Sequence, residues 1–358
     1  MEKAIFVPPP WLAWRQLQVR GPLRGLIVVL GPLVIFTLFL LAVGVDPVKT
    51  YRMMLQSALG DRYGVSEVLI RATPFLLAGL ATAIPARVGL INVGAEGQLA
   101  LGALFTASAA TALGSGLPGL VLIPLLVVAG MLGGALWGGL AGWLRVRLQL
   151  NETIATLLLN YVATLTVAYC VHSFLKDPAS FNWPFSPPLP DQARFLTIGG
   201  TRLHWGVLLA PVAALGVWYL VSRTVWGLHM RVVGGNGEAA QRAGLNVERI
   251  QLLAFLLAGA LAGLAGMIEV AGVEGRLRPT TGVGFGYVGF LAAWMVSHHP
   301  LWLIGSSLLL AVIAVSGDAL QITAGLPASS VNILMALVLI GVLARIEWPL
   351  LKKDDGRR

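Results

Sequence analysis

Charged residues are scarce in this sequence. They make up 11% of the 358 residues, while 57% are hydrophobic, and an average soluble domain carries roughly 25% charged residues. A soluble fold of this size could not cover its surface with so few charges. The composition argues against a cytosolic enzyme, a disordered protein and a free DNA-binding module, and it predicts lipid as the surroundings of most of the chain.

Several chemical motifs are also missing. The single cysteine, Cys170, cannot build a disulfide framework or a zinc cluster. His298 and His299 are neighbours, about 100° apart on a helix, which is poor geometry for a shared metal, so no metal site is expected. The sequence has no H-E-x-x-H and no G-x-S-x-G motif, which disfavours a membrane-embedded enzyme. It has no Gly-Lys dipeptide, so it contains no Walker A loop for ATP.

Long apolar runs dominate what is present. A membrane-spanning helix needs about 20 mostly apolar residues, and the runs predict an all-α, polytopic membrane helical bundle of about ten transmembrane helices. The transmembrane domain is expected over 25–347. The predicted spans are 25–44, 68–86, 89–113, 117–143, 153–175, 205–222, 250–272, 282–298, 301–317 and 329–347.

The distribution of Lys and Arg predicts the orientation. With the N-terminus inside and alternating spans, 16 of the 25 basic residues fall on inside segments, as the positive-inside rule requires. Segments 1–24 and 348–358 would then be cytoplasmic, 176–204 an external loop, and 223–249 a cytoplasmic loop. The net charge of +9 therefore reflects membrane topology, and no nucleic-acid partner is expected.

The fourth predicted span carries a glycine every four residues. Gly130, Gly134, Gly138 and Gly142 lie on one face of a helix, where a second backbone can come close. We interpret this series as a helix-packing face without chemistry of its own.

Polar residues interrupt the third span, where Asn92, Glu96 and Gln98 stand among three glycines. Such residues usually face a bundle interior or a water-filled path. A second glycine-rich stretch, 282–289, contains Phe285, and paired interruptions in two halves of a transporter indicate the substrate path. Asn160 and Glu269, in other spans, are further path candidates. The alternative is that Glu96 is a satisfied contact between helices and that the glycines only pack.

The cytoplasmic loop contains a short predicted helix. Glu238 to Arg242 favour helix, with Ala239 and Ala240 between them, and Gly244 would end it. Such a helix suits docking of a cytoplasmic partner, and an ordinary interfacial helix is the alternative.

This loop resembles a known family. The pattern E-A-A-x-x-x-G at Glu238–Gly244 is similar to the coupling segment of ABC importer permeases, although the Ile and Leu-Pro that follow in the full motif are absent. That departure fits the branch for simple sugars, nucleosides and branched-chain amino acids. Three further stretches resemble this branch, and its nucleoside permeases above all. They are 89–98 (G-L-I-N-V-G-A-E-G-Q), 151–161 (N-E-T-I-A-T-L-L-L-N-Y) and 282–300.

The resemblance implies a permease subunit of the bacterial inner membrane and not an enzyme. It would pair with a second permease or a copy of itself, with two ATPase subunits that hold ATP and Mg²⁺, and with an external substrate-binding protein. Glu238, Ala239, Ala240 and Gly244 would couple it to the ATPases, and no cofactor is expected on this chain. A nucleoside or simple sugar would suit Asn92, Gln98 and Asn160. The alternative is an ion-coupled secondary transporter that uses Glu96 and Glu269.

Overall fold

The computed structural model describes residues 22–114, 116–327 and 330–347. Within these ranges the chain is helical and contains no strand, apart from one isolated antiparallel bridge between Thr197 and His204. The prediction of an all-α fold is confirmed for this part of the chain. Most of the predicted segment 1–24 and all of 348–358 lie outside the described residues.

The helices follow one another with short connections, except for one long loop before α8. Their bounds are α2 (Pro22–Ala42), α3 (Pro47–Leu59), α4 (Arg62–Ala86), α5 (Ala95–Leu113), α6 (Gly119–Leu148), α7 (Glu152–His172), η1 (Asp191–Ala193), η2 (Trp205–Leu208), α8 (Leu209–Arg223), α9 (Val225–Gly235), α10 (Gly237–Arg242), α11 (Val247–Ile268), η3 (Glu269–Glu274), α12 (Phe285–Met295), α13 (Trp302–Ala324) and α14 (Ser330–Glu347).

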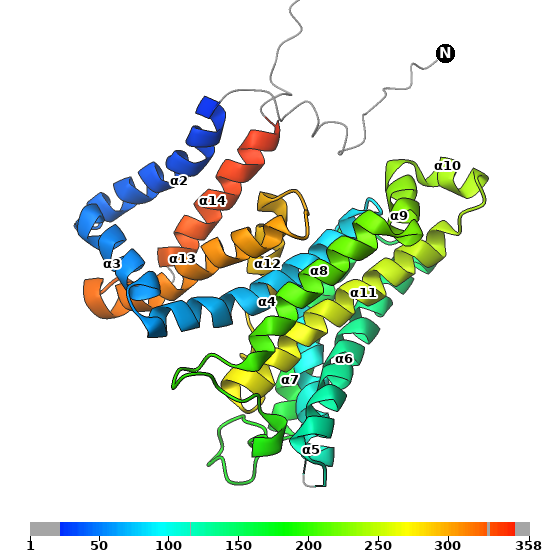
Figure 1. The fold of residues 1–358 in the computed structure, drawn as a ribbon, viewed down its shortest axis with the longest axis horizontal. Coiled ribbons are helices and arrows are strands. Elements are labelled where there is room, and N and C mark those ends of the chain that lie inside the picture. Colours follow the sequence, from blue (N-terminus) through cyan, green and yellow to red (C-terminus); the bar gives the residue numbers. More distant parts are fainter. Residues whose placement is uncertain (1–21, 115, 328–329, 348–358) are drawn as a thin grey trace, which may run out of the picture.

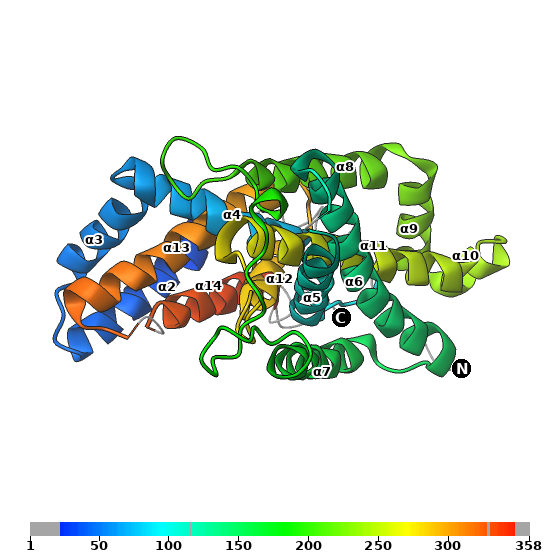
Figure 2. The same cartoon turned by 90° about the horizontal axis from the view of Figure 1, so that it is seen from below.

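The helices form two groups that share α4 and α12. In Figures 1 and 2, α5, α6, α7, α8 and α11 make up one group, and α2, α3, α13 and α14 the other. The helix α11 packs against α4, α5 and α6, while α4 also packs against α12 and α13. Most of α4 and α11 is buried, and these two helices form the centre of the fold.

Fewer helices are long enough to cross a membrane than the sequence predicts. Among the described residues, five are long and apolar enough: α4, α6, α7, η2–α8 and α11–η3. A sixth is possible if α2 and α3, which are bent by 116°, form one span. The count of ten is therefore not confirmed. The predicted span 282–298 contains only the 11-residue α12, and the predicted span 89–113 becomes helical only at Ala95.

Side-chain caps explain where several helices begin. Asp, Asn or Thr precedes a first turn and accepts a hydrogen bond from a free backbone N–H, which is the usual N-cap interaction. These caps are Asp46, Asp61, Asn151, Thr224, Asn236 and Asn246.

The helices α6 and α11 touch along the glycine series. A Cβ atom added to Gly134 would lie 2.1 Å from the carbonyl oxygen of Gly259, and one added to Gly259 would lie 2.1 Å from that of Gly134. A Cβ atom added to Gly130 would lie 3.1 Å from the carbonyl oxygen of Gly263, and one added to Gly138 would lie 2.5 Å from that of Phe255. Gly142 lies against the side chain of Phe255. Only a hydrogen atom fits at these positions, so the two backbones come into direct contact.

The two ends of the bundle differ. At one end, α9 and α10 project beyond the other helices. At the opposite end, the loop 173–204 covers η3 and the residues after it. Backbone hydrogen bonds join Phe195 to Ala271, Leu189 to Gly275 and Ser186 to Leu277.

Candidate functional site

The chain leaves helical geometry between α4 and α5. The helix α4 ends at Ala86, and residues 88–94 run without regular structure before α5 begins at Ala95. Gly89 has φ +77°, a conformation that glycine adopts at no steric cost. Irregular backbone inside a membrane protein must be buried in protein or line a cavity, so the partners of this segment matter.

Asn92 and Gln98 make hydrogen bonds within and around the interrupted segment. Each of the two side-chain amides donates a hydrogen bond to the amide oxygen of the other, at 3.2 Å. Asn92 Oδ1 also accepts from the Gly94 amide at 2.9 Å, and Asn92 Nδ2 also donates to the Ala81 carbonyl at 3.1 Å. Both side chains are buried. They therefore act in this conformation as hydrogen-bonded contacts within the protein.

Asn160 connects α7 to the same segment. Its Oδ1 accepts from the Gly97 amide at 2.9 Å, and its Nδ2 donates to the Val93 carbonyl at 2.9 Å and to the Tyr287 hydroxyl at 3.3 Å. Since Tyr287 belongs to α12, this one amide joins α5, α7 and α12.

The second interruption lies between η3 and α12. Gly282 and Gly284 have φ +69° and +90°, and α12 begins at Phe285. The Glu96 carboxylate, in the first turn of α5, accepts hydrogen bonds from the Gly284 amide at 2.5 Å and the Gly286 amide at 2.7 Å. A Cβ atom on Gly286 would lie 2.2 Å from the Glu96 nitrogen. The two helix N-termini thus meet directly, and the carboxylate charge stabilises these positive ends.

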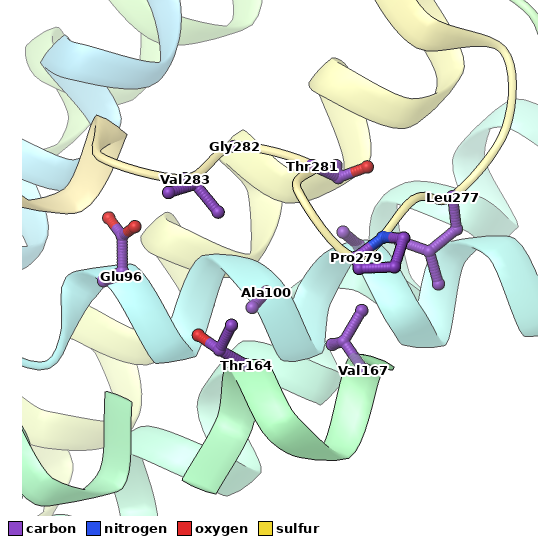
Figure 3. A pocket seen from close by; sticks show the side chains of 10 residues that line it. Glu96, Ala100, Thr164, Val167, Leu277, Pro279, Thr281, Gly282 and Val283 are labelled. Carbon is purple, nitrogen blue, oxygen red and sulfur yellow. The ribbon is translucent and has the colours of Figure 1, made fainter. Parts of the chain in front are cut away.

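A narrow cavity lies next to Glu96. It measures about 10 Å³, close to the minimum for one water molecule. Figure 3 shows its walls: Ala100 of α5, Thr164 and Val167 of α7, and the segment from Leu277 to Val283. The carboxylate of Glu96 points toward that segment.

A larger, charged cavity lies on the other side of the same segment. Its volume is about 290 Å³, at the lower limit of small-molecule sites, which span roughly 300–1,000 Å³. Glu269 and Phe285, two predicted path residues, line it. The other lining residues are Glu67, Ile70, Arg71, Arg202, Val273, Glu274, Arg278, Thr280, Gly282 and Val283.

The segment from 277 to 283 separates the two cavities. Leu277, Pro279 and Thr281 line the narrow cavity, while Arg278 and Thr280 line the charged one. Gly282 and Val283 line both cavities. Thr281 also donates a hydrogen bond to Glu274 at 2.6 Å. We call residues 277–283 the partition strip.

Sequence reasoning placed Glu269 and Phe285 on a common path, and the structure brings them to one cavity. Glu96 lines the narrow cavity, while neither cavity is lined by Asn92, Gln98 or Asn160. Several cavity residues were missed: Glu67, Arg71, Arg202, Glu274 and Arg278.

One signal could have found Arg71. It is a charged residue inside the predicted span 68–86, and such residues mark functional positions by default. Arg202 and Arg278 gave no comparable signal, because they reach the cavity only through the folding of loops. Among the described residues, no group of three or more His, Cys, Asp or Glu side chains could hold a metal ion.

The predicted coupling segment forms α10 and the turn after it, at the end of the molecule opposite the loop 173–204. Asn236 caps this helix, and Ala240 is buried. Glu238 and Arg242 are exposed, and Arg242 Nη2 lies 3.7 Å from Glu238 Oε2. Gly244 has φ +84° just after the helix. The preceding helix α9 touches the first interruption, since a Cβ atom on Gly234 would lie 2.3 Å from the Arg87 carbonyl oxygen.

A bundle of apolar helices with two interrupted segments, meeting beside a polar cavity, is the architecture of a multi-pass membrane transport protein. The chain belongs to the family described as the branched-chain amino acid transport system permease component, whose model matches residues 64–343. It is thus a transport subunit rather than an enzyme.

Three relatives with known names cover nearly the whole chain. The glucose ABC transporter permease protein TsgB13 of Haloferax volcanii is 34% identical and covers 93% of this chain and 87% of its own length. The guanosine ABC transporter permease protein NupP of Bacillus subtilis is 30% identical, with coverages of 85% and 88%. The nucleoside ABC transporter permease protein NupB of Lactococcus lactis is 26% identical, with 92% of each chain covered. The predicted membership of the sugar and nucleoside permeases is confirmed.

Proposed function

We propose that this chain is the permease subunit of an ABC importer in a bacterial inner membrane, and that it carries a nucleoside or a simple sugar inward. An external binding protein delivers the solute at the end formed by the loop 173–204. Two ATPase subunits bind at the opposite, cytoplasmic end. A second permease of the same family, or a copy of this chain, completes the membrane part.

The observation that carries this proposal is the position of the charged cavity. It reaches Gly282, Val283 and Phe285, which is where the N-termini of α5 and α12 meet. Polar groups and broken helices at one place are costly in a membrane protein, and a solute path accounts for both.

The partition strip separates this cavity from Glu96 in the present conformation. A solute that passes the strip would next meet Glu96 and then Asn160, Asn92 and Gln98. These side chains now bind backbone groups, and they would exchange those partners for the solute when the path opens. The left-handed Gly282 and Gly284 supply backbone freedom at the end of the strip.

Contacts at the other end suggest how ATP hydrolysis reaches this path. Arg87 touches α9 through Gly234, and its guanidinium donates to the His298 carbonyl at 3.2 Å, just beyond α12. A displacement of α10 by the ATPases would therefore move α9, then the first interruption, and then α12.

Transport measurements test the proposal. The chain is reconstituted into vesicles with its ATPases and binding protein, and uptake of radiolabelled guanosine and glucose is measured with ATP and with a non-hydrolysable analogue. Uptake of either solute that requires hydrolysable ATP is the expected result. Uptake that persists without ATP and disappears with an ionophore would instead support the secondary transporter that uses Glu96 and Glu269.

Variants of the α10 region test the docking assignment. Gly244→Val places a β-branched residue at φ +84°, whereas Gly244→Asn tolerates that conformation far better. We expect Gly244→Val to lose solute-stimulated ATP hydrolysis, Gly244→Asn to keep most of it, and both to insert normally. The exposed Glu238→Ala variant should weaken ATPase binding, and Asp46→Asn, at the start of α3 and outside both docking regions, is its control. Normal transport by Gly244→Val would overturn the assignment of α10.

A further inference from the structure

The charged cavity contains as many positive as negative groups. Three carboxylates, Glu67, Glu269 and Glu274, line it together with three guanidinium groups, Arg71, Arg202 and Arg278. Because a buried net charge is costly, a cavity that is already balanced favours a solute without net charge.

Two of the three acids have partners in the protein. Arg202 Nη1 lies 3.3 Å from both oxygens of Glu67. Glu274 accepts a hydrogen bond from Thr281 at 2.6 Å, and Arg278 lies 3.9 Å from it. These four charged groups can therefore line the cavity without a ligand.

Glu269 and Arg71 are the third carboxylate and the third guanidinium group of the cavity. Among the described residues, no donor makes a hydrogen bond or ion pair to the Glu269 carboxylate, although the residue is only 6% exposed. Arg71 makes no ion pair within the same part of the chain, and its guanidinium lies over the Phe285 ring, 5.4 Å from the ring centre. The carboxylate lines the cavity and only accepts hydrogen bonds when ionised, so a ligand in the cavity that supplies donors can bind it.

The chemistry of these two groups defines the ligand. An ionised carboxylate only accepts hydrogen bonds, and its two oxygens suit two neighbouring hydroxyl groups, whereas a guanidinium only donates. Phe285, which packs edge-on against Phe75 at 5.6 Å, adds an apolar wall for the face of a ring.

We propose that Glu269 and Arg71 form the solute-recognition pair of the charged cavity, in which Glu269 binds the vicinal hydroxyls of an uncharged ring solute and Arg71 binds a neighbouring acceptor. This inference rests on the proposed function, because it assigns the solute that the importer carries. A nucleoside presents the ribose diol and the acceptors of its base, and a hexose presents diols and its ring oxygen.

Uptake of matched solutes tests the role of Glu269. The pairs are guanosine with 2′,3′-dideoxyguanosine and glucose with 1,3-dideoxyglucose, and the second member of each pair has no two hydroxyls on adjacent ring carbons. Each pair is measured as a ratio of initial rates at low concentration. The binding protein is identical in every sample, so a change in the ratio between variants belongs to the permease. The variants are Glu269→Gln, Glu269→Ala and a control, Asp46→Asn. Asp46 is an exposed N-cap of α3 outside the cavity, and asparagine caps a helix about as well as aspartate.

Wild type and Asp46→Asn are expected to prefer the diol by the same factor. Loss of the acceptor in Glu269→Ala should reduce this preference by roughly tenfold or more, as expected when a hydrogen-bonding site no longer senses a hydroxyl. Glu269→Gln should fall between them. An unchanged ratio in Glu269→Ala would overturn the inference while leaving the proposed function intact. Wild-type uptake of leucine with neither guanosine nor glucose carried would overturn both the inference and the solute class of the proposed function. Failure of ATP-dependent uptake in wild type would instead remove the proposed function.

A second measurement covers variants that do not fold. Val273→Cys, in a Cys170→Ala background, places a thiol on the cavity wall. Guanosine or glucose should slow its alkylation by a methanethiosulfonate reagent, and the deoxy analogue should protect it less. No protection by either parent solute, in a protein that transports it, would also overturn the inference.

Discussion

Replacing Gly134 by alanine should separate the two central helices of the bundle. The new Cβ atom would lie 2.1 Å from the Gly259 carbonyl oxygen and 2.7 Å from the Gly263 Cα atom, and ordinary contact begins near 3.4 Å. Both neighbours are backbone atoms, so no side chain can rotate away. The helices α6 and α11 must move apart locally by about 1.3 Å, and a gap of that order forfeits much of the dispersion energy across the contact.

The expected loss of stability follows from this displacement. Overpacking a well-packed interface costs typically about 1–3 kcal/mol, and the backbone clash puts Gly134→Ala near the upper end. An unfolding entropy of about 2.1 cal/mol/K per residue amounts to about 0.75 kcal/mol/K for 358 residues, so each kcal/mol lowers the midpoint of thermal unfolding by about 1.3 °C and a decrease of roughly 3–4 °C is expected.

The single cysteine provides the assay. Cys170 is buried in α7, so a thiol-reactive fluorogenic dye reports its exposure as the detergent-solubilised protein is heated, and Cys170→Ser supplies the blank. Gly216→Ala is the matched control, since a Cβ atom there meets nothing within 4 Å. It should melt like wild type or slightly higher, because alanine favours helix over glycine. If Gly134→Ala melts like Gly216→Ala, direct backbone contact does not hold α6 against α11.

Three further predictions concern other contacts. Glu96→Ala removes the acceptor for the Gly284 and Gly286 amides and should lower stability by about 1–3 kcal/mol, more than Glu96→Gln does; equal thermal melts of the two variants would contradict this. Gly234→Ala places a Cβ atom 2.3 Å from the Arg87 carbonyl oxygen, so the solute moved per ATP hydrolysed should fall, and an unchanged ratio would show that this contact does not transmit motion. Burial, and then the positive charge of Arg202, lowers the pKa of His204 to about 4 from 6.5, so the folded protein favours the neutral ring. Its contribution to stability is complete above pH 6.5 and is lost as the pH falls toward 4. The melting temperature of wild type should therefore fall more steeply between pH 6.5 and 4 than that of His204→Phe. Parallel plots of melting temperature against pH would contradict this role of His204.

The helical class and the interrupted segments could be predicted from the sequence, because both follow from local residue patterns. Apolar runs of span length define the helices, and Asn92 and Glu96 among glycines indicate broken backbone. Span boundaries were predicted less well near the second interruption. Apolarity continues from Gly282 to Val296, but Gly282 and Gly284 adopt left-handed conformations, and the helix covers only Phe285–Met295.

The charged cavity could be predicted only in part. Glu269 and Arg71 stand in apolar surroundings, so their cost in lipid marks them individually. That Arg202 and Arg278 would reach the same cavity depends on how the loop 173–204 and the partition strip fold over η3, which involves contacts between residues far apart in the sequence. Local patterns contain no information on such contacts.

The division of residues 277–281 between the two cavities has an evolutionary consequence. Substitutions at positions 278 and 280 alter the wall that faces the charged cavity, whereas 277, 279 and 281 contact the α5 and α7 side. Substitutions at 278 and 280 leave the contacts of 277, 279 and 281 intact. A lineage can therefore acquire a new solute by varying 278 and 280 while the packing against α5 and α7 is conserved.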